Sequence, residues 1–141
     1  MERKKILVID DEADMRTFLS TVMTANGFQP VPAKDAAEGL RRARAECPDC
    51  IILNAMIGGE GGVTLYSALK TDAAVRNVPV LLLSALPGRT FFRLHPFPRG
   101  DGERAVPRPE AFLETPCEAG EIVDTVCTLV ESPADVAGPP A

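Results

Sequence analysis

Five polar residues that could do chemistry together follow apolar runs of the chain: Asp10, Asp11, Asn54, Ser84 and Thr115. The adjacent carboxylates of Asp10 and Asp11 repel each other, and a hard cation such as Mg²⁺ would remove that repulsion because it takes oxygen ligands. The pair therefore predicts a cation site. The plainer alternative is two loop acids near a helix N-terminus, where negative charge is mildly favoured.

The elements that must position these residues alternate between strands and helices. Apolar runs predict strands at residues 5–9, 28–33, 50–53, 78–83 and 111–114. The second run contains Pro30 and Pro32, which lack the N–H that a ladder requires, so it belongs at a sheet edge. Strands alternating with helices predict an α/β fold with a parallel sheet and right-handed crossovers.

Helices are predicted where apolar residues recur at helical spacing, over residues 15–23, 36–46, 63–70 and 119–131. Asp35 and Glu38 form a capping-box pattern at the start of the second helix. A glycine-rich loop at 58–62 precedes the third. Residues 87–110 contain five prolines, which predicts a long loop there instead of a helix. The folded domain is expected to span 1–131, with 132–141 a flexible tail or linker start.

An edge position for the second strand fits the strand order 2-1-3-4-5. Ligands of such sheets bind beyond the carboxyl ends of the strands, near the switch point between strands one and three. All five polar residues named above lie at that edge. The topology therefore predicts a site there.

Composition excludes several classes of protein. A chain of 141 residues suits one domain, and its formal net charge of -5 disfavours sequence-independent binding to nucleic acid. No apolar run is long enough to span a membrane, and the N-terminus lacks the pattern of a signal peptide. Four cysteines without a secretion signal predict reduced thiols in the cytoplasm.

The motifs resemble those of response-regulator receiver domains of two-component signalling, and of chemotaxis regulators in particular. They occur at residues 5–12, 48–53 with Met56 and Gly62, 79–85 and 112–116. The resemblance implies a flavodoxin-like, doubly wound five-stranded sheet. It also implies Mg²⁺ ligands at Asp10, Asp11 and the Met56 main-chain carbonyl, a switch hydroxyl at Ser84 and an aromatic rotamer switch at Phe112.

Two positions depart from the family pattern. Asn54 stands where the family has its phosphoacceptor aspartate, and Thr115 stands where it has a switch lysine. An amide is a poor nucleophile and cannot form the acyl phosphate. Mg²⁺ is expected to bind weakly, since one anionic ligand is lost. Two acids alone carry the same formal charge as three acids with one lysine, so the double loss keeps the charge of the unphosphorylated site.

The chain is therefore interpreted as a degenerate receiver: a binding module, not an enzyme, that works without phosphorylation. Its partner would be a signalling protein, either a histidine kinase or an effector domain in cis or trans, and a homodimer is a further alternative. A second interpretation keeps phosphoryl transfer, with Asp10 or Asp11 as the acceptor.

Residues 87–110 carry five arginines against three acids. Phe91, Phe92 and Arg93 are the predicted partner-binding residues, because phenylalanine and arginine are common interface anchors. The alternative is that the phenylalanines pack in the core, where a helix would otherwise sit. The segment is expected to be extended, with few regular hydrogen bonds.

A third interpretation of the chain is a redox protein, because Cys47 and Cys50 form a C-x-x-C motif. This motif, however, ends a predicted helix and opens a strand, opposite to the thioredoxin-like arrangement, and it lies at the far edge of the sheet from Asp10. Cys117 and Cys127 are predicted to lie elsewhere, which excludes a four-cysteine zinc site.

Overall fold

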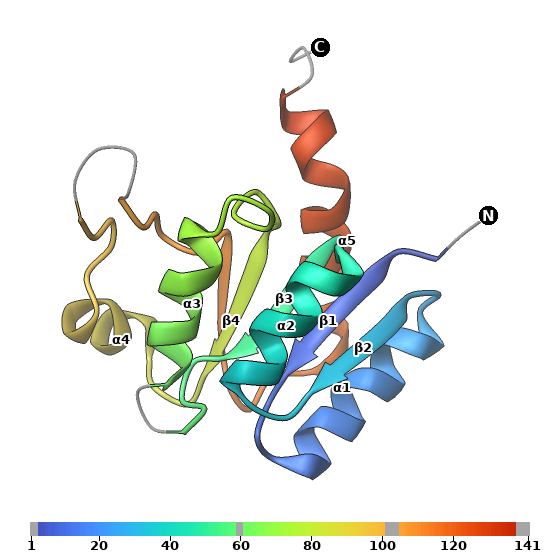
Figure 1. Cartoon of the computed structure of the whole chain (residues 1–141). Coiled ribbons are helices and arrows are strands. Elements are labelled where there is room, and N and C mark those ends of the chain that lie inside the picture. The colour runs from blue at the N-terminus through green and yellow to red at the C-terminus, as the bar shows by residue number, and fades with distance from the viewer. Residues whose placement is uncertain (1–2, 59–60, 101–104, 138–141) are drawn as a thin grey trace.

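The computed structural model describes residues 3–58, 61–100 and 105–137. The predicted glycine-rich loop, the proline-rich segment and the predicted tail each fall partly outside these ranges. Five parallel strands form one sheet in the order β2-β1-β3-β4-β5, which confirms the predicted order and fold class (Figure 1). The strands are β1 Lys5–Ile9, β2 Gln29–Ala33, β3 Cys50–Asn54, β4 Val80–Ser84 and β5 Ala111–Glu114.

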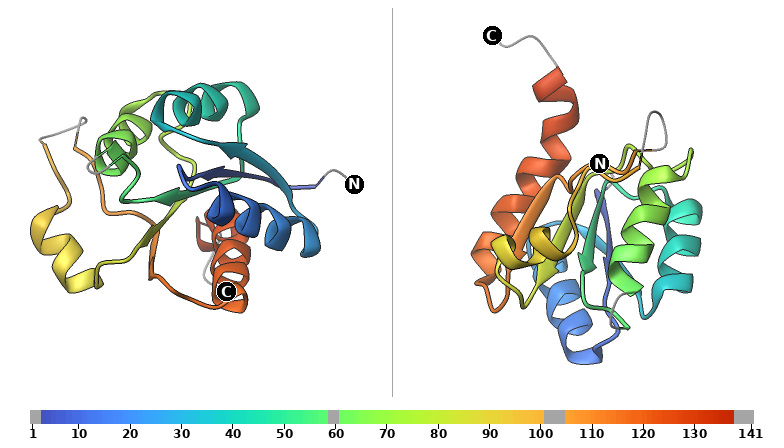
Figure 2. Two further views of the ribbon diagram at one scale, coloured as in Figure 1. Left: turned by 90° about the horizontal axis from the view of Figure 1, so that it is seen from below. Right: turned by 90° about the vertical axis from the view of Figure 1, so that its left-hand side faces the viewer.

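Helices cover both faces of the sheet. They are α1 Ala13–Ala25, α2 Ala36–Glu46, α3 Gly61–Thr71, α4 Gly88–Leu94 and α5 Ala119–Ala137. α1 and α5 lie on one face, and α2 and α3 lie on the other (Figure 2). Within the described ranges, no helix has the length and apolar character needed to cross a bilayer.

The central strands are buried on both faces, as their apolar runs predict. In β1, Leu7 and Ile9 pack in the core beneath α2 and α3, whereas Ile6 and Val8 pack beneath α1 and α5. All four are fully buried. β2 pairs only with β1, so the edge position predicted from its prolines is confirmed.

The start of α2 follows the predicted capping pattern. The Asp35 carboxylate accepts a hydrogen bond from the Glu38 backbone N–H (2.8 Å), and the Glu38 carboxylate accepts one from the Lys34 N–H (2.8 Å). Two backbone donors near the helix end are thereby satisfied by side chains. This cap aligns α2 over β1.

The prediction that the fourth helix is missing is wrong. Residues Gly88–Leu94 form the short helix α4, with Pro87 as its N-cap. Proline breaks a helix from within, but the nearest prolines, Pro87 and Pro96, flank α4. They delimit the helix, and the fully buried Phe91 attaches it to the core.

The segment after α4 is more firmly bonded than the sequence predicts. Arg99 and Val106 exchange backbone hydrogen bonds in an antiparallel bridge (2.8 and 2.6 Å). The Tyr66 hydroxyl donates to the Pro107 carbonyl (2.7 Å). The Lys70 ammonium donates to both carboxylate oxygens of Glu110 (2.9 Å each). Two side chains of α3 therefore hold the segment against the domain.

The last helix is longer than predicted. α5 continues to Ala137, past its expected end at residue 131, so the predicted tail at 132–141 begins as helix. In Figure 1 the final turns of α5 extend beyond the sheet. Residues 138–141 lie outside the described part of the chain.

Replacing Gly62 by alanine is expected to destabilise the domain by about 1–3 kcal/mol. A Cβ at this position would lie 2.7 Å from the Asn54 carbonyl oxygen and would collide with the Ala55 carbonyl. Gly120→Ala is the matched control, because its Cβ meets nothing within 4 Å. That change should raise stability by up to about 1 kcal/mol. Urea denaturation measures both, and equal midpoints for the two variants would contradict this account of α3 packing.

Candidate functional site

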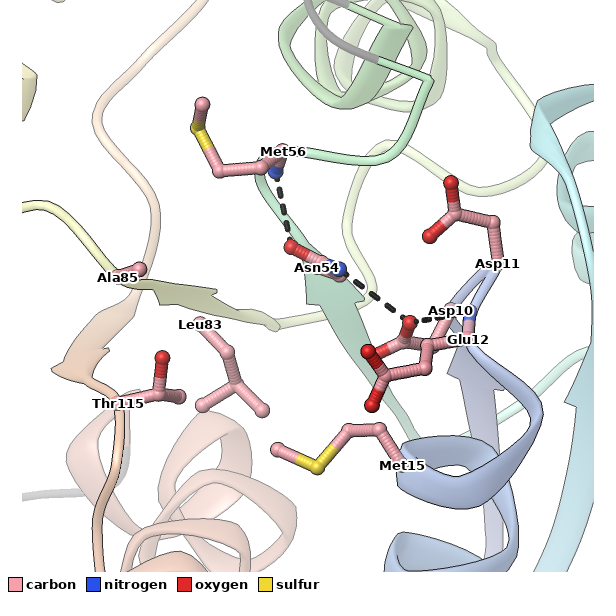
Figure 3. A pocket seen from close by; sticks show the side chains of 9 residues that line it. All are labelled: Asp10, Asp11, Glu12, Met15, Asn54, Met56, Leu83, Ala85 and Thr115. Atoms are coloured by element: carbon pink, nitrogen blue, oxygen red, sulfur yellow. Dashed lines mark hydrogen bonds between the residues drawn. The ribbon is translucent and has the colours of Figure 1, made fainter.

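A pocket of about 230 Å³ opens at the carboxyl ends of β1, β3 and β4 (Figure 3). It is lined by Asp10, Asp11, Glu12, Met15, Asn54, Met56, Leu83, Ala85 and Thr115. The structure therefore brings together four of the five polar residues at strand ends, and Ser84 lies beneath them, 1% exposed. The pocket thus forms at the edge of the sheet where the strand order predicts a site.

Asp10 is the buried acid of the pocket, with only 2% of its surface exposed. Its Oδ1 accepts hydrogen bonds from the Glu12 backbone N–H (2.9 Å) and from the Asn54 amide (3.3 Å). Arg16 donates to the Asp10 main-chain carbonyl (2.8 Å). A buried carboxylate needs such donors, because burial without them is costly.

Asn54 is held by hydrogen bonds at both ends of its amide group. Its Nδ2 donates to Asp10 Oδ1, and its Oδ1 accepts from the Met56 backbone N–H (2.9 Å). The reverse orientation would set the amide oxygen against a carboxylate and the amide N–H against another donor. The amide therefore presents hydrogen, not oxygen, to Asp10.

Asp11 and Met56 occupy the outer rim of the pocket. Asp11 is exposed, and its Oδ2 accepts from the Gly58 N–H (3.2 Å). Gly58 has a φ of +52°, a left-handed conformation. Proline is usual at this position in receiver domains, but its ring fixes φ at about -65°, so it could not adopt this conformation.

The carboxylates of Asp10 and Asp11 are the two anionic groups of the predicted metal site. Among the described residues, no group of three or more His, Cys, Asp or Glu side chains is arranged to hold a metal.

The predicted switch residues lie on the β4 and β5 side of the pocket. The Ser84 hydroxyl oxygen accepts from the Leu86 N–H (3.0 Å), and the Thr115 N–H donates to the Ser84 carbonyl (2.8 Å). Among the described residues, no basic side chain lines the pocket, and Thr115 adds none. Phe112 does not face the pocket. It packs on Phe91 and Phe92, with ring centroids 5.2 and 5.1 Å away.

The three residues predicted to bind a partner differ in their exposure to solvent. Phe91 is fully buried, so the prediction that it contacts a partner is wrong, and its role in the core was the alternative. Phe92 is half-buried and Arg93 is exposed. The helical period explains the split, because α4 directs Phe91 inward and Arg93 outward.

The C-x-x-C motif does not form a redox site in this structure. Cys47 is exposed at the end of α2, but Cys50 is fully buried in β3. Burial raises the pKa of the Cys50 thiol to about 12, whereas a reactive thiol needs a lowered pKa. The redox interpretation therefore lacks the second reactive sulfur.

Sequence reasoning missed several lining residues, including Glu12, Met15 and Leu83. Glu12 follows the acidic pair directly, so the acidic run itself was a signal. Met15 falls in the helix predicted over residues 15–23, and Leu83 falls in the strand predicted over residues 78–83. Nothing in a periodic pattern distinguishes a core methionine from one at a pocket wall.

Comparisons with known proteins identify the family of this chain. A family model for the response regulator receiver domain matches residues 6–90. The chain is 38% identical over 82 residues to the phosphate regulon transcriptional regulatory protein PhoB of Klebsiella pneumoniae, which covers 58% of this chain and 36% of PhoB. It is 40% identical over 86 residues to the response regulator PleD of Caulobacter vibrioides, which covers 60% of this chain and 19% of PleD. The match thus spans well under half the length of these relatives.

Solved structures share the fold. The receiver domain of the Francisella response regulator 1452 superposes with a TM-score of 0.74 at 24% identity, covering 92% of this chain and 98% of that one. A sensor protein from Polaromonas sp. JS666 superposes with a TM-score of 0.77 at 18% identity, covering 93% and 98%. The family model covers more than half of the chain. This chain belongs to the response regulator receiver domain family.

Proposed function

We propose that this receiver domain acts as a degenerate, phosphorylation-independent protein-binding module in two-component signalling. The observation that carries the proposal is the side chain at the end of β3. Asn54 offers no ionised oxygen, and its amide is engaged by Asp10 and Met56. A carboxylate is the nucleophile that an acyl phosphate requires, and an amide cannot replace it.

The rest of the pocket supports the same proposal. A transferred phosphoryl group carries negative charge that a cationic side chain or metal must stabilise. In the part of the chain that the structure describes, the pocket is lined by three acids and by no basic residue. An incoming phosphoryl group would meet the carboxylates of Asp10, Asp11 and Glu12 with no basic side chain among the described lining residues. The structure thus favours binding over phosphoryl transfer.

Mg²⁺ would be held by Asp10 and Asp11, and we infer that it binds weakly. Such a cation would neutralise the negative charge of the two carboxylates. In this chain the Asn54 amide already donates a hydrogen to Asp10 (3.3 Å). The need for a cation beside Asp10 is therefore reduced.

The proposed partner is a signalling protein, either a histidine kinase or an effector domain in cis or in trans. The exposed face of α4 and the segment after it support this assignment. This region carries exposed arginines that form no ion pair with a described residue. Phe92 and Arg93 remain the candidate contacts. A second copy of the chain is the alternative partner.

Acetyl phosphate with Mg²⁺ is expected to leave the intact mass of the wild-type protein unchanged. The double variant Asn54→Asp with Thr115→Lys should gain the mass of one phosphoryl group, because it regains the nucleophile and the cation. Intact-mass spectrometry with peptide mapping makes the measurement. A phosphoryl group mapped to Asp10 or Asp11 of the wild type would instead support the second interpretation, an alternative acceptor.

Asn54→Asp alone is expected to bind Mg²⁺ about tenfold more tightly than the wild type, because it adds an anionic ligand. Without Mg²⁺ the same variant should melt at a lower temperature, since a new carboxylate would face Asp10. Thermal melts with and without Mg²⁺ measure both effects. Asn77→Asp is the control, because it adds the same charge at an exposed position away from the pocket. An equal Mg²⁺ response from both variants would refute the assignment.

A further inference from the structure

The arginines of α2 differ in their partners from those of α4 and the segment after it. Those on α2 each pair with an acid: Arg41 with Glu38 (3.4 Å), Arg42 with Glu46 (3.9 Å) and Arg44 with Asp72 (2.7 Å). The arginines of α4 and the segment after it are exposed and form no ion pair with any described residue: Arg89, Arg93, Arg99 and Arg108. Within the described ranges, these four guanidinium groups therefore have no acidic partner, although the net charge of the chain is -5.

Arg108 lies over an aromatic ring. Its Cζ is 4.0 Å from the centroid of the Phe92 ring, within the range of a cation–π contact. Phe92 is itself packed edge-on against Phe91 (5.1 Å) and lies beside Phe112 (5.1 Å). The N–H groups of a guanidinium radiate in its plane. Arg108 is exposed and forms no ion pair with a described residue, so its N–H groups are able to donate to a partner.

Residues on both sides of Arg108 accept hydrogen bonds from side chains of α3. The preceding residue, Pro107, accepts from the Tyr66 hydroxyl (2.7 Å). Glu110 accepts from Lys70, whose side chain is 2% exposed, and from the Val80 N–H (2.8 Å). An arginine held in this way loses less conformational freedom on binding than a free surface side chain.

Two further arginines lie on α4, the helix that carries Phe92. Arg89, Phe92 and Arg93 have helical spacings of three and four and share one face of α4. That face points away from the buried Phe91. In Figures 1 and 2, α4 and the following segment lie at one edge of the molecule. Arg89, Arg93 and Arg108 form the arginine cluster, with Phe92 at its centre.

We propose that the arginine cluster binds carboxylate side chains of an acidic segment in a partner protein. A guanidinium offers two parallel N–H donors that match the two oxygens of a carboxylate. The exposed Leu94 (61%) and the half-buried Phe92 add apolar contact beside the charges. Nucleic acid fits less well, because binding to a phosphate backbone relies on many cationic contacts along the strand, whereas the cluster supplies three arginines. This proposal rests on the proposed protein-binding function and names its partner chemistry.

The probe is a short fluorescein-labelled, glutamate-rich peptide that contains leucine, and fluorescence anisotropy measures its binding to the full chain. Arg108→Gln and the pair Arg89→Gln with Arg93→Gln are each expected to weaken binding about tenfold, as expected for loss of a charged hydrogen-bond partner. Arg108→Lys should lose most of the affinity too, because lysine keeps the charge but lacks the planar fork. The control Arg41→Gln, on α2, should bind like the wild type.

Four outcomes would overturn the proposal. Equal losses from Arg41→Gln and Arg108→Gln would mean that charge alone governs binding, and full affinity in Arg108→Lys would exclude the fork. Tighter binding of a single-stranded oligonucleotide than of the peptide would point to nucleic acid. Sedimentation as a dimer that Arg89→Gln with Arg93→Gln dissociates would make a second copy the occupant. The mass test with acetyl phosphate involves none of these residues, so the proposed function and this proposal can fail separately.

Discussion

The hydrogen bond between the Asn54 amide and the Asp10 carboxylate is the interaction on which the character of this site depends. Parallel pairing of β1 and β3 brings a nearly fully buried acid beside the residue that ends β3. In a receiver with an aspartate at that position, two carboxylates would meet and a cation would have to lie near them. Here a neutral donor satisfies the buried acid, so the pocket is complete in its unphosphorylated form.

The support for this arrangement comes from backbone contacts around the pocket. Gly62 lets the start of α3 lie against the Asn54 and Ala55 carbonyls, where a side chain would not fit. The Met56 and Gly58 N–H groups bond to Asn54 and Asp11, so the loop after β3 is bonded to the polar groups it surrounds. A substitution from carboxylate to amide is therefore accommodated without loss of the surrounding structure.

The chain departs from the family pattern at two places, the pocket and the region that begins at α4. The pocket lacks the phosphoacceptor and the lysine, and the family match ends at residue 90, within α4. Beyond that point Tyr66 and Lys70 of α3 bind the segment that leads to β5. In that region the Arg108 guanidinium lies over the Phe92 ring.

The sequence alone determined the strands, their order, the capped start of α2 and the position of the pocket, because hydrophobic period, proline chemistry and strand-end polarity are local signals. It also determined that an amide and a hydroxyl, Asn54 and Thr115, stand at strand ends where the family pattern has an aspartate and a lysine. Only the tertiary structure decided that α4 forms, that Phe91 is core and Arg93 is surface, and that Arg108 lies on Phe92. Those outcomes depend on contacts between residues distant in sequence, such as Lys70 with Glu110 and Tyr66 with Pro107, whose geometry no local pattern encodes.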